Sequence, residues 1–140
     1  MYIQRAAEDI VRLTSQQFGV LLITGPRQVG KTTLLQKLAE KDRRYVTLDD
    51  PDARQLAQED PALFMQRYKP PVIIDEIQYA PEILPYIKMS VDSSKRKGDF
   101  WLTGSHVFQT MKNVSESLAG RVGIIELLGL SNSELNHVTS

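Results

Sequence analysis

Two short motifs in this sequence carry residue types suited to binding a polyphosphate and cleaving it. The first is G-x-x-x-x-G-K-T at residues 25–32, which lies between an apolar run at 20–23 and a helix-like pattern at 31–40. A strand, a glycine-rich turn and a helix start are the context in which this motif forms a phosphate-binding loop. A chance match in a strand–turn–helix unit is the competing explanation, and the flanks on both sides disfavour it.

The residue types of this loop suit anion capture. Gly25 and Gly30 allow backbone conformations that a side chain would obstruct, so the loop N–H groups can turn inward around phosphate oxygens. The following helix adds the positive end of its dipole. Lys31 would reach the β- and γ-phosphates, and the Thr32 hydroxyl would bind Mg²⁺. The expected nucleotide-binding residues are Gly25, Pro26, Arg27, Gln28, Val29, Gly30, Lys31, Thr32 and Thr33.

The second motif is a pair of adjacent carboxylates, Asp75 and Glu76, that directly follows an apolar run at residues 72–74. Ligands of open α/β sheets bind at the carboxyl ends of the strands, so we expect the pair beside the phosphate loop. Asp75 then holds Mg²⁺ with Thr32, and Glu76 orients and deprotonates an attacking water. Such a pair is otherwise a helix cap or a solvated turn; the phosphate loop upstream favours the metal role.

Four further residues are candidates for chemistry, and ordinary structural roles compete with that reading. Thr103 or Ser105, after an apolar run at residues 100–102, could touch the γ-phosphate or the attacking water, but Ser105 equally suits the N-cap of a helix over 107–111. Asp49 ends a strand near the phosphates, although capping explains the acidic residues there more simply. Arg121 carries a guanidinium suited to phosphoryl charge, or forms a structural salt bridge.

The remaining patterns predict an alternation of helices and strands. Asp50 and Asp60 each precede a proline, which indicates an N-cap followed by the first helical residue. Pro85 lies at most one turn inside a helix that begins near Pro81, and it should tighten or kink that helix. We expect helices at 3–17 and 31–40 and after Asp50, Asp60, Pro81 and Ser105, with strands at 20–23, 45–48, 72–74, 100–102 and 122–128.

Composition narrows the class of protein. A chain of 140 residues, 41% of them hydrophobic, suits one globular domain. Its 17 basic and 17 acidic residues give no global field for nucleic acid or an anionic membrane, and the basic run at 95–97 suits a solvated turn. The chain has no cysteine, signal peptide or apolar run of membrane-spanning length, so we expect a cytoplasmic protein.

Taken together, five blocks resemble one family. They are residues 24–33, 48–51, 74–78, 102–105 and 117–121. They resemble the prokaryotic AAA-type (AAA+) P-loop ATPases in which the ATPase domain is followed by a second domain of uncharacterised function. The resemblance extends from about residue 20 to about residue 130.

The resemblance implies an α/β, three-layer P-loop NTPase sandwich, with a five-stranded parallel sheet in the order 5-1-4-3-2 and helices on both faces. It implies that residues 25–32 are the Walker A motif, that Asp75 and Glu76 are the Walker B pair, and that 103–105 form the sensor-1 region. It also makes Arg121 a candidate arginine finger that acts on a neighbouring subunit of a homo-oligomer. Family members continue into a helical lid and a second domain, so residues 1–130 are interpreted as the ATPase core and 131–140 as the truncated start of a lid or tail.

These observations predict a Mg²⁺-dependent enzyme that hydrolyses ATP to ADP and phosphate, with Glu76, Lys31, Arg121 and Ser105 as the candidate catalytic residues. The alternative is a nucleotide-dependent interaction switch that acts on a protein partner with little or no hydrolysis. A metabolite kinase is disfavoured because Glu76 directly follows Asp75. A GTPase is disfavoured because nothing resembles an Asn-Lys-x-Asp motif, and a nucleic-acid partner is not indicated.

Overall fold

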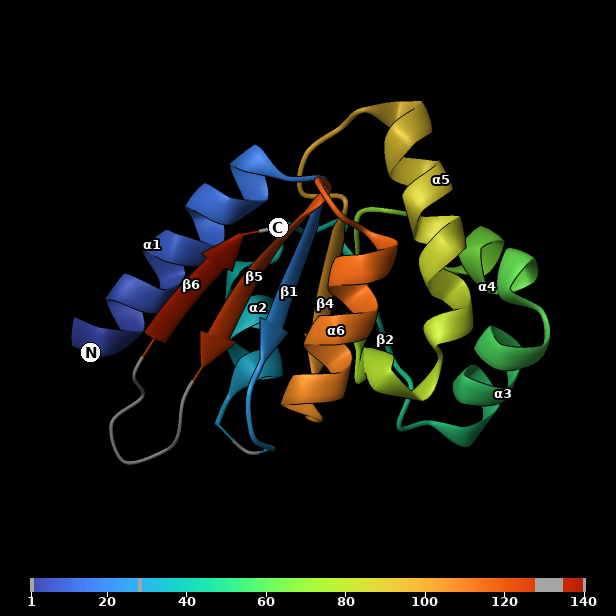
Figure 1. Cartoon of the computed structure of the whole chain (residues 1–140), viewed down its shortest axis with the longest axis horizontal. Coiled ribbons are helices and arrows are strands. Elements are labelled where there is room, and N and C mark those ends of the chain that lie inside the picture. The colour runs from blue at the N-terminus through green and yellow to red at the C-terminus, as the bar shows by residue number, and fades with distance from the viewer. Residues whose placement is uncertain (1, 28, 128–134, 140) are drawn as a thin grey trace.

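The core of the molecule is one mixed sheet in the order β2-β3-β4-β1-β5-β6, shown in Figure 1. The structure is a computed structural model that describes residues 2–27, 29–127 and 135–139. Its strands are β1 (Val20–Thr24), β2 (Arg44–Thr47), β3 (Val72–Asp75), β4 (Phe100–Gly104), β5 (Val122–Leu127) and β6 (Leu135–Thr139). The first five are parallel, and their order confirms the predicted 5-1-4-3-2 arrangement.

The central strands are buried on both faces, which is why they appear in the sequence as continuous apolar runs. All five residues of β1 are buried. In the register of the sheet, Leu22 of β1 lies between Leu102 of β4 and Ile124 of β5. Because β1 to β5 run in the same direction, their connections fall into two groups, one at each edge of the sheet.

Helices cover both faces of the sheet and complete the predicted three layers (Figure 1). They are α1 (Tyr2–Gln17), α2 (Lys31–Leu38), α3 (Pro51–Glu59), α4 (Pro61–Arg67), α5 (Leu84–Ser94) and α6 (Val107–Ser117), with short 3₁₀ turns η1 (Ile77–Tyr79) and η2 (Pro81–Ile83). Val11 of α1 and Leu35 of α2 pack in one core cluster; Phe64 of α4 and Val114 of α6 pack in the other. Each helix in the described parts of the chain is too short or too polar to span a bilayer.

Two helix starts carry the aspartate caps that the sequence predicts, and one capping role considered in the sequence is absent. The Asp50 carboxylate accepts a hydrogen bond from the Asp52 N–H, and the Asp60 carboxylate accepts one from the Leu63 N–H, so both predicted N-caps are confirmed. Pro85 lies in the first turn of α5, directly after the 3₁₀ turn η2. Of the two roles considered for Ser105, the N-cap role is not found: His106 holds the N-cap position of α6 without a side-chain hydrogen bond, and the Ser105 hydroxyl donates to Glu76.

The sheet extends one strand beyond the prediction. β6 pairs antiparallel with β5, from Gly123 opposite Thr139 to Leu127 opposite Leu135. This strand lies within residues 131–140, where the sequence was interpreted as the start of a lid or tail. Residues 128–134 and 140 lie outside the described residues, and the lid assignment stays a prediction.

Candidate functional site

The loop between β1 and α2 has a backbone conformation that requires its two glycines. Gly25 has φ 153°, and a Cβ on it would lie 2.3 Å from the carbonyl oxygen of Leu127. Gly30 has φ 91° and occupies the N-cap position of α2. L-residues with a side chain rarely adopt these angles, so the loop can be built only with glycine at both ends. Gln28, predicted as a binding residue, lies outside the described residues.

Lys31 is held inside this loop. Its side-chain nitrogen donates hydrogen bonds to the carbonyls of Gly25 and Pro26, at 2.9 Å each, and the residue is 5% exposed. Burial lowers the pKa of Lys31, while the nearby Glu76 and Asp75 carboxylates oppose that shift. The ammonium group borders a hollow of about 220 Å³. This hollow is lined by Arg27, Gly30, Lys31, Thr32, Thr33 and Glu76.

The Asp75 carboxylate, at the end of β3, links the two predicted motifs. Its Oδ1 accepts hydrogen bonds from the Thr32 hydroxyl at 2.5 Å and the Thr103 hydroxyl at 2.6 Å. Its Oδ2 accepts one from the Thr47 hydroxyl at 2.8 Å, and the Tyr45 hydroxyl lies at 3.4 Å. The sequence analysis missed Tyr45 and Thr47. The one available signal was their place on a strand expected next to β3.

Glu76 lies beside Asp75 with an unusual backbone. Its φ is 62° and its ψ is 55°, a left-handed conformation that is uncommon outside glycine and that clusters at functional sites. Its Oε1 accepts hydrogen bonds from the Gln78 amide and the Ser105 hydroxyl, both at 2.7 Å. Within the described residues, Oε2 has no hydrogen-bond partner. The Ser105 hydroxyl therefore orients the side chain of Glu76.

A third carboxylate, Asp49, completes the acidic side of the site. Oxygen atoms of Asp49, Asp75 and Glu76 all lie within 4.8 Å of one another. Asp49 is bound by Arg27 of the phosphate loop, with Nη2 at 3.2 Å from Oδ1, and the same nitrogen donates to the Tyr79 hydroxyl at 3.1 Å. These two hydrogen bonds raise the pKa of Arg27. Carboxylate and hydroxyl oxygens are the ligands that Mg²⁺ prefers, so the donor set fits this metal.

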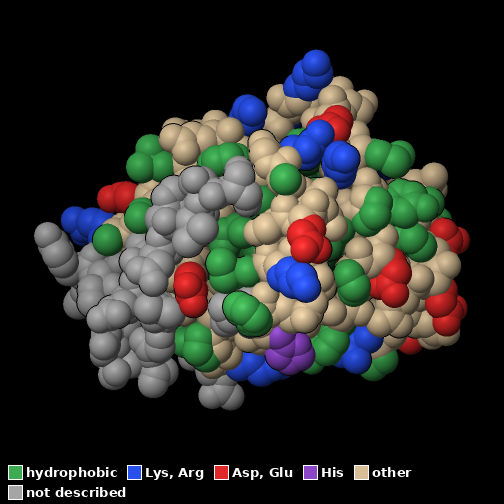
Figure 2. All heavy atoms as spheres, viewed as in Figure 1, with side chains coloured by type: hydrophobic (Ala, Val, Ile, Leu, Met, Phe, Trp, Pro, Cys, Tyr) green, Lys and Arg blue, Asp and Glu red, His purple; other side chains and the backbone are tan. Residues whose placement is uncertain are grey.

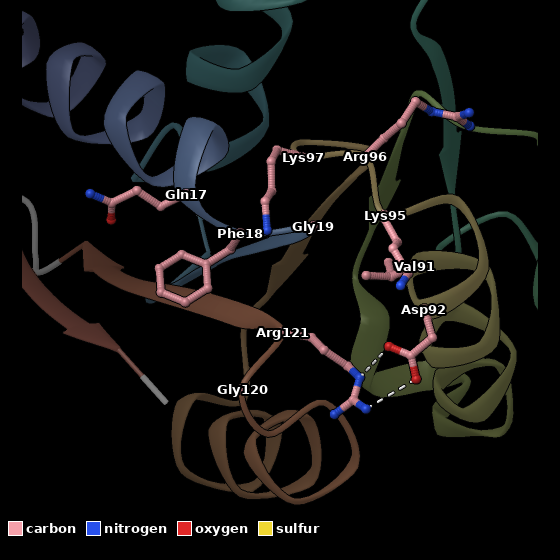
Figure 3. Close-up of a pocket in the computed structure, with 10 residues that line it drawn as sticks. All are labelled: Gln17, Phe18, Gly19, Val91, Asp92, Lys95, Arg96, Lys97, Gly120 and Arg121. Atoms are coloured by element: carbon pink, nitrogen blue, oxygen red, sulfur yellow. Dashed lines mark hydrogen bonds and ion pairs between the residues drawn. The ribbon is translucent and has the colours of Figure 1, made fainter.

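Arg121 lies elsewhere, just before β5 and so at the opposite edge of the sheet from the phosphate loop. Figure 3 shows its guanidinium facing Asp92 of α5, at 2.6 and 3.0 Å. This ion pair raises the pKa of Arg121 and lowers that of Asp92. The structural salt bridge considered for Arg121 is thus present. Within one chain Arg121 is not brought to the phosphate loop, and its action on a neighbouring subunit stays a prediction.

The sheet order, the loop after β1 and the carboxylates at the tip of β3 define the P-loop NTPase class in its AAA form. The family comparison agrees: the model of the family described as AAA domain matches residues 17–136. The chain belongs to this family, and it is therefore a nucleotide-binding, ATPase-type domain.

Two curated relatives carry no assigned function. The chain is 38% identical over 131 residues to the uncharacterized protein Rv2008c of Mycobacterium tuberculosis and to the uncharacterized protein Mb2031c of Mycobacterium bovis. The match covers 91% of this chain but only 29% of either relative. Among solved structures, the chain is similar in fold to the DnaC helicase loader, with a TM-score of 0.50, 18% identity and coverage of 86% of this chain and 81% of that one.

Proposed function

We propose that this AAA domain hydrolyses ATP to ADP and phosphate in a Mg²⁺-dependent reaction. The observation that carries the proposal is the junction of the two motifs: Thr32 of the phosphate loop is hydrogen-bonded to Asp75, and Glu76 lines the same hollow as Lys31. The residues that we propose to bind phosphate, hold the metal and act as the base therefore line this hollow or contact a residue that does.

The phosphate loop would hold the β- and γ-phosphates. Its backbone N–H groups and the N-terminus of α2 supply partial positive charge. The Lys31 ammonium, now bonded to the carbonyls of Gly25 and Pro26, would exchange these for phosphate oxygens. A bound polyphosphate would offset the burial that now disfavours the charged form of this lysine.

The Thr32 hydroxyl and the Asp75 carboxylate are the residues that would hold Mg²⁺. Thr103 and Thr47 fix the orientation of that carboxylate from the two neighbouring strands. When bound, the ion would neutralise charge on the phosphate oxygens.

Glu76 would act as the general base. Ser105 and Gln78 hold its Oε1, which leaves Oε2 to accept a hydrogen bond from the attacking water. The carboxylate takes the proton of that water while the water oxygen bonds to the γ-phosphorus. The bond from that phosphorus to the bridging oxygen breaks, and ADP leaves with the electron pair.

The first test replaces the base with its amide. Glu76→Gln keeps the size of the side chain and one oxygen that can accept the bonds from Ser105 and Gln78, but removes its capacity to accept the proton. We expect ATP binding within about threefold of wild type and phosphate release reduced by at least about a hundredfold. Binding is measured with a fluorescent ATP analogue and turnover by phosphate release, and Glu82→Gln, an exposed glutamate in η2, is the matched control. Unchanged phosphate release in Glu76→Gln would remove Glu76 from the mechanism.

One observation favours the alternative of a nucleotide-dependent switch. Arg27 of the phosphate loop bonds to Tyr79, and Arg54 of α3 stacks over the Tyr79 ring at 3.9 Å. Gln58 of α3 also donates to the Tyr79 carbonyl at 2.6 Å. A phosphate that drew Arg27 away would therefore change the contacts that position α3. Tight Mg²⁺–ATP binding without measurable turnover of the wild-type chain would favour this function over hydrolysis.

A further inference from the structure

The edge of the sheet where the parallel strands begin collects basic residues that are far apart in the sequence. Lys41 and Arg44 precede or open β2, Lys69 precedes β3, and Lys95 and Lys97 precede β4. All five are exposed, and together they are called the basic edge. In Figure 2, Lys and Arg side chains gather at the top of the molecule, over the α5–β4 connection, with an acidic side chain among them, and further Asp and Glu side chains lie over α3 and α4.

The basic edge carries charge that its own surroundings do not neutralise. Glu40, Asp92 and Asp99 are paired with other cations, namely Arg43, Arg121 and Arg96. Asp42, in the connection before β2, is the one further carboxylate in the described connections that precede the parallel strands. Within the described part of the chain, none of the five residues of the basic edge forms an ion pair. The net excess of positive charge is therefore local, in a chain whose formal net charge is zero.

The helix dipoles stabilise some of these lysines without holding them in a hydrogen bond. Cations near a helix C-terminus interact favourably with its dipole, and Lys95 is the C-cap residue of α5. In the described residues, however, no lysine of the basic edge donates a hydrogen bond to a helix-end carbonyl. Arg44 donates to the Lys69 carbonyl at 3.1 Å, which holds two of the connections together.

The surface beside these cations is concave. A hollow of about 420 Å³ lies where the connections before β1, β4 and β5 meet. Lys97 and Lys95 border it, and Arg121 faces it from the β5 side (Figure 3). Phe18 and Val91 contribute apolar lining. The hollow thus combines cations at its rim with space for a planar ring between apolar side chains.

We propose that the basic edge binds a single strand of nucleic acid through its phosphates, with the hollow beside Lys97 receiving a base. The starts of the neighbouring strands β2, β3 and β4 place these cations across two strand spacings, roughly 10 Å, which suits a short row of phosphates. An acidic protein partner fits less well, because protein interfaces centre on buried apolar side chains. The large exposed apolar side chains of the described residues are Leu13, Tyr45, Leu63, Met89 and Phe108, and none lies in these connections.

The test measures binding of a fluorescein-labelled 20-nucleotide oligothymidylate to the whole 140-residue chain by anisotropy over a series of salt concentrations. We expect the logarithm of the affinity to fall with the logarithm of salt, with a slope of about −2 for three phosphate contacts on a single strand. The double variant Lys95→Glu with Lys97→Glu should weaken binding by about tenfold or more at ~0.1 M salt. Both side chains are exposed, so the variant should unfold within about 5 °C of the wild type, the loss at the C-cap of α5 being the main effect.

The matched control is Arg5→Glu with Lys112→Glu, which makes the same change in net charge on exposed positions of α1 and α6. It should alter oligonucleotide binding by less than about twofold. Equal loss in both double variants, no salt-dependent binding, or equally tight binding of polyglutamate would each overturn the proposal. A further contrary outcome would be a chain that binds no oligonucleotide but self-associates, with the Lys95 and Lys97 changes abolishing the self-association. ATP binding by the same variants should remain as in wild type, because the basic edge lies at the opposite edge of the sheet from the phosphate loop.

Discussion

At the scale of single residues, the orientation of Asp75 decides what the site can bind. Its two oxygens face hydroxyl groups from three elements: Thr32 from α2, Tyr45 and Thr47 from β2, and Thr103 from β4. An ionised carboxylate only accepts hydrogen bonds, at about four lone-pair positions, so these groups nearly saturate it. The carboxylate therefore has one preferred orientation before any ion arrives.

Thr47→Val should test this orientation. Valine has nearly the shape of threonine but lacks the hydroxyl, so Oδ2 of Asp75 loses its 2.8 Å hydrogen bond. We expect the concentration of Mg²⁺ needed for half-maximal tightening of ATP binding to rise about fivefold, which corresponds to one hydrogen bond of about 1 kcal/mol. Thr47→Ser should restore the wild-type value. Equal weakening of ATP binding with and without Mg²⁺ would show that Thr47 shapes the loop instead.

Residue identity predicted most of the site but not its internal contacts. The glycines, Lys31, Thr32 and the Asp75–Glu76 pair are recognisable because their chemistry is tied to a short local spacing. Thr47 and Gln78 carry no such local signature. Their role follows from which strands are neighbours and where the Glu76 backbone turns, and sequence spacing does not encode either.

At the scale of elements, aspartate–proline pairs start consecutive helices. Asp50 caps α3 and Asp60 caps α4, and each is followed by proline at the first helical position. The side-chain oxygen satisfies an N–H group that the first turn would leave unpaired, and proline has no N–H to lose there. The Phe64 side chain of α4 is fully buried in the core, so the start of this short helix also fixes a core residue.

Asp60→Ala should destabilise the fold by about 1 kcal/mol, because the Leu63 N–H loses its partner. The measurement is urea unfolding followed by circular dichroism. Asp60→Asn keeps an oxygen that can cap the helix, so it should retain most of the wild-type stability. Equal losses in the two variants would indicate that the charge of Asp60, and not the cap, carries the effect.

The sequence predicted best the helix starts that are marked by a capping aspartate followed by proline. At Ser105 the sequence left capping and a role near the phosphates open; its hydroxyl donates to Glu76, just beyond the end of β3, and not to the helix. The sequence also did not anticipate β6, since pairing with β5 depends on which edge of the sheet is open. Tertiary contacts override local preference at both places.

At the scale of the whole molecule, the parallel sheet separates two kinds of chemistry. Its carboxyl edge holds the phosphate loop with Asp49, Asp75 and Glu76. Its opposite edge holds the basic connections and Arg121. Within one chain the two edges do not meet, so a role for Arg121 in hydrolysis requires a second copy of the chain.

Turnover per chain should therefore rise with protein concentration if Arg121 acts as an arginine finger on a neighbour. Arg121→Ala should abolish that rise and leave ATP binding unchanged. Asp92→Asn is the matched control, because it disrupts the same ion pair but retains the guanidinium, so the rise should persist. Turnover per chain that is independent of concentration in the wild type would contradict the role in trans, and Arg121 would then be a structural partner of Asp92.

The sequence by itself determined the class of fold and the core of the nucleotide site. Continuous apolar runs specify buried parallel strands, and the loop and carboxylate motifs are short enough for their chemistry to be local. The tertiary structure alone decided which hydroxyls hold Asp75, that Ser105 serves Glu76, and that lysines from separate connections form one basic edge. The physical reason is that parallel strands bring residues that are far apart in the chain to the same edge of the sheet. A formal net charge of zero gives no sign of such a local cluster of cations.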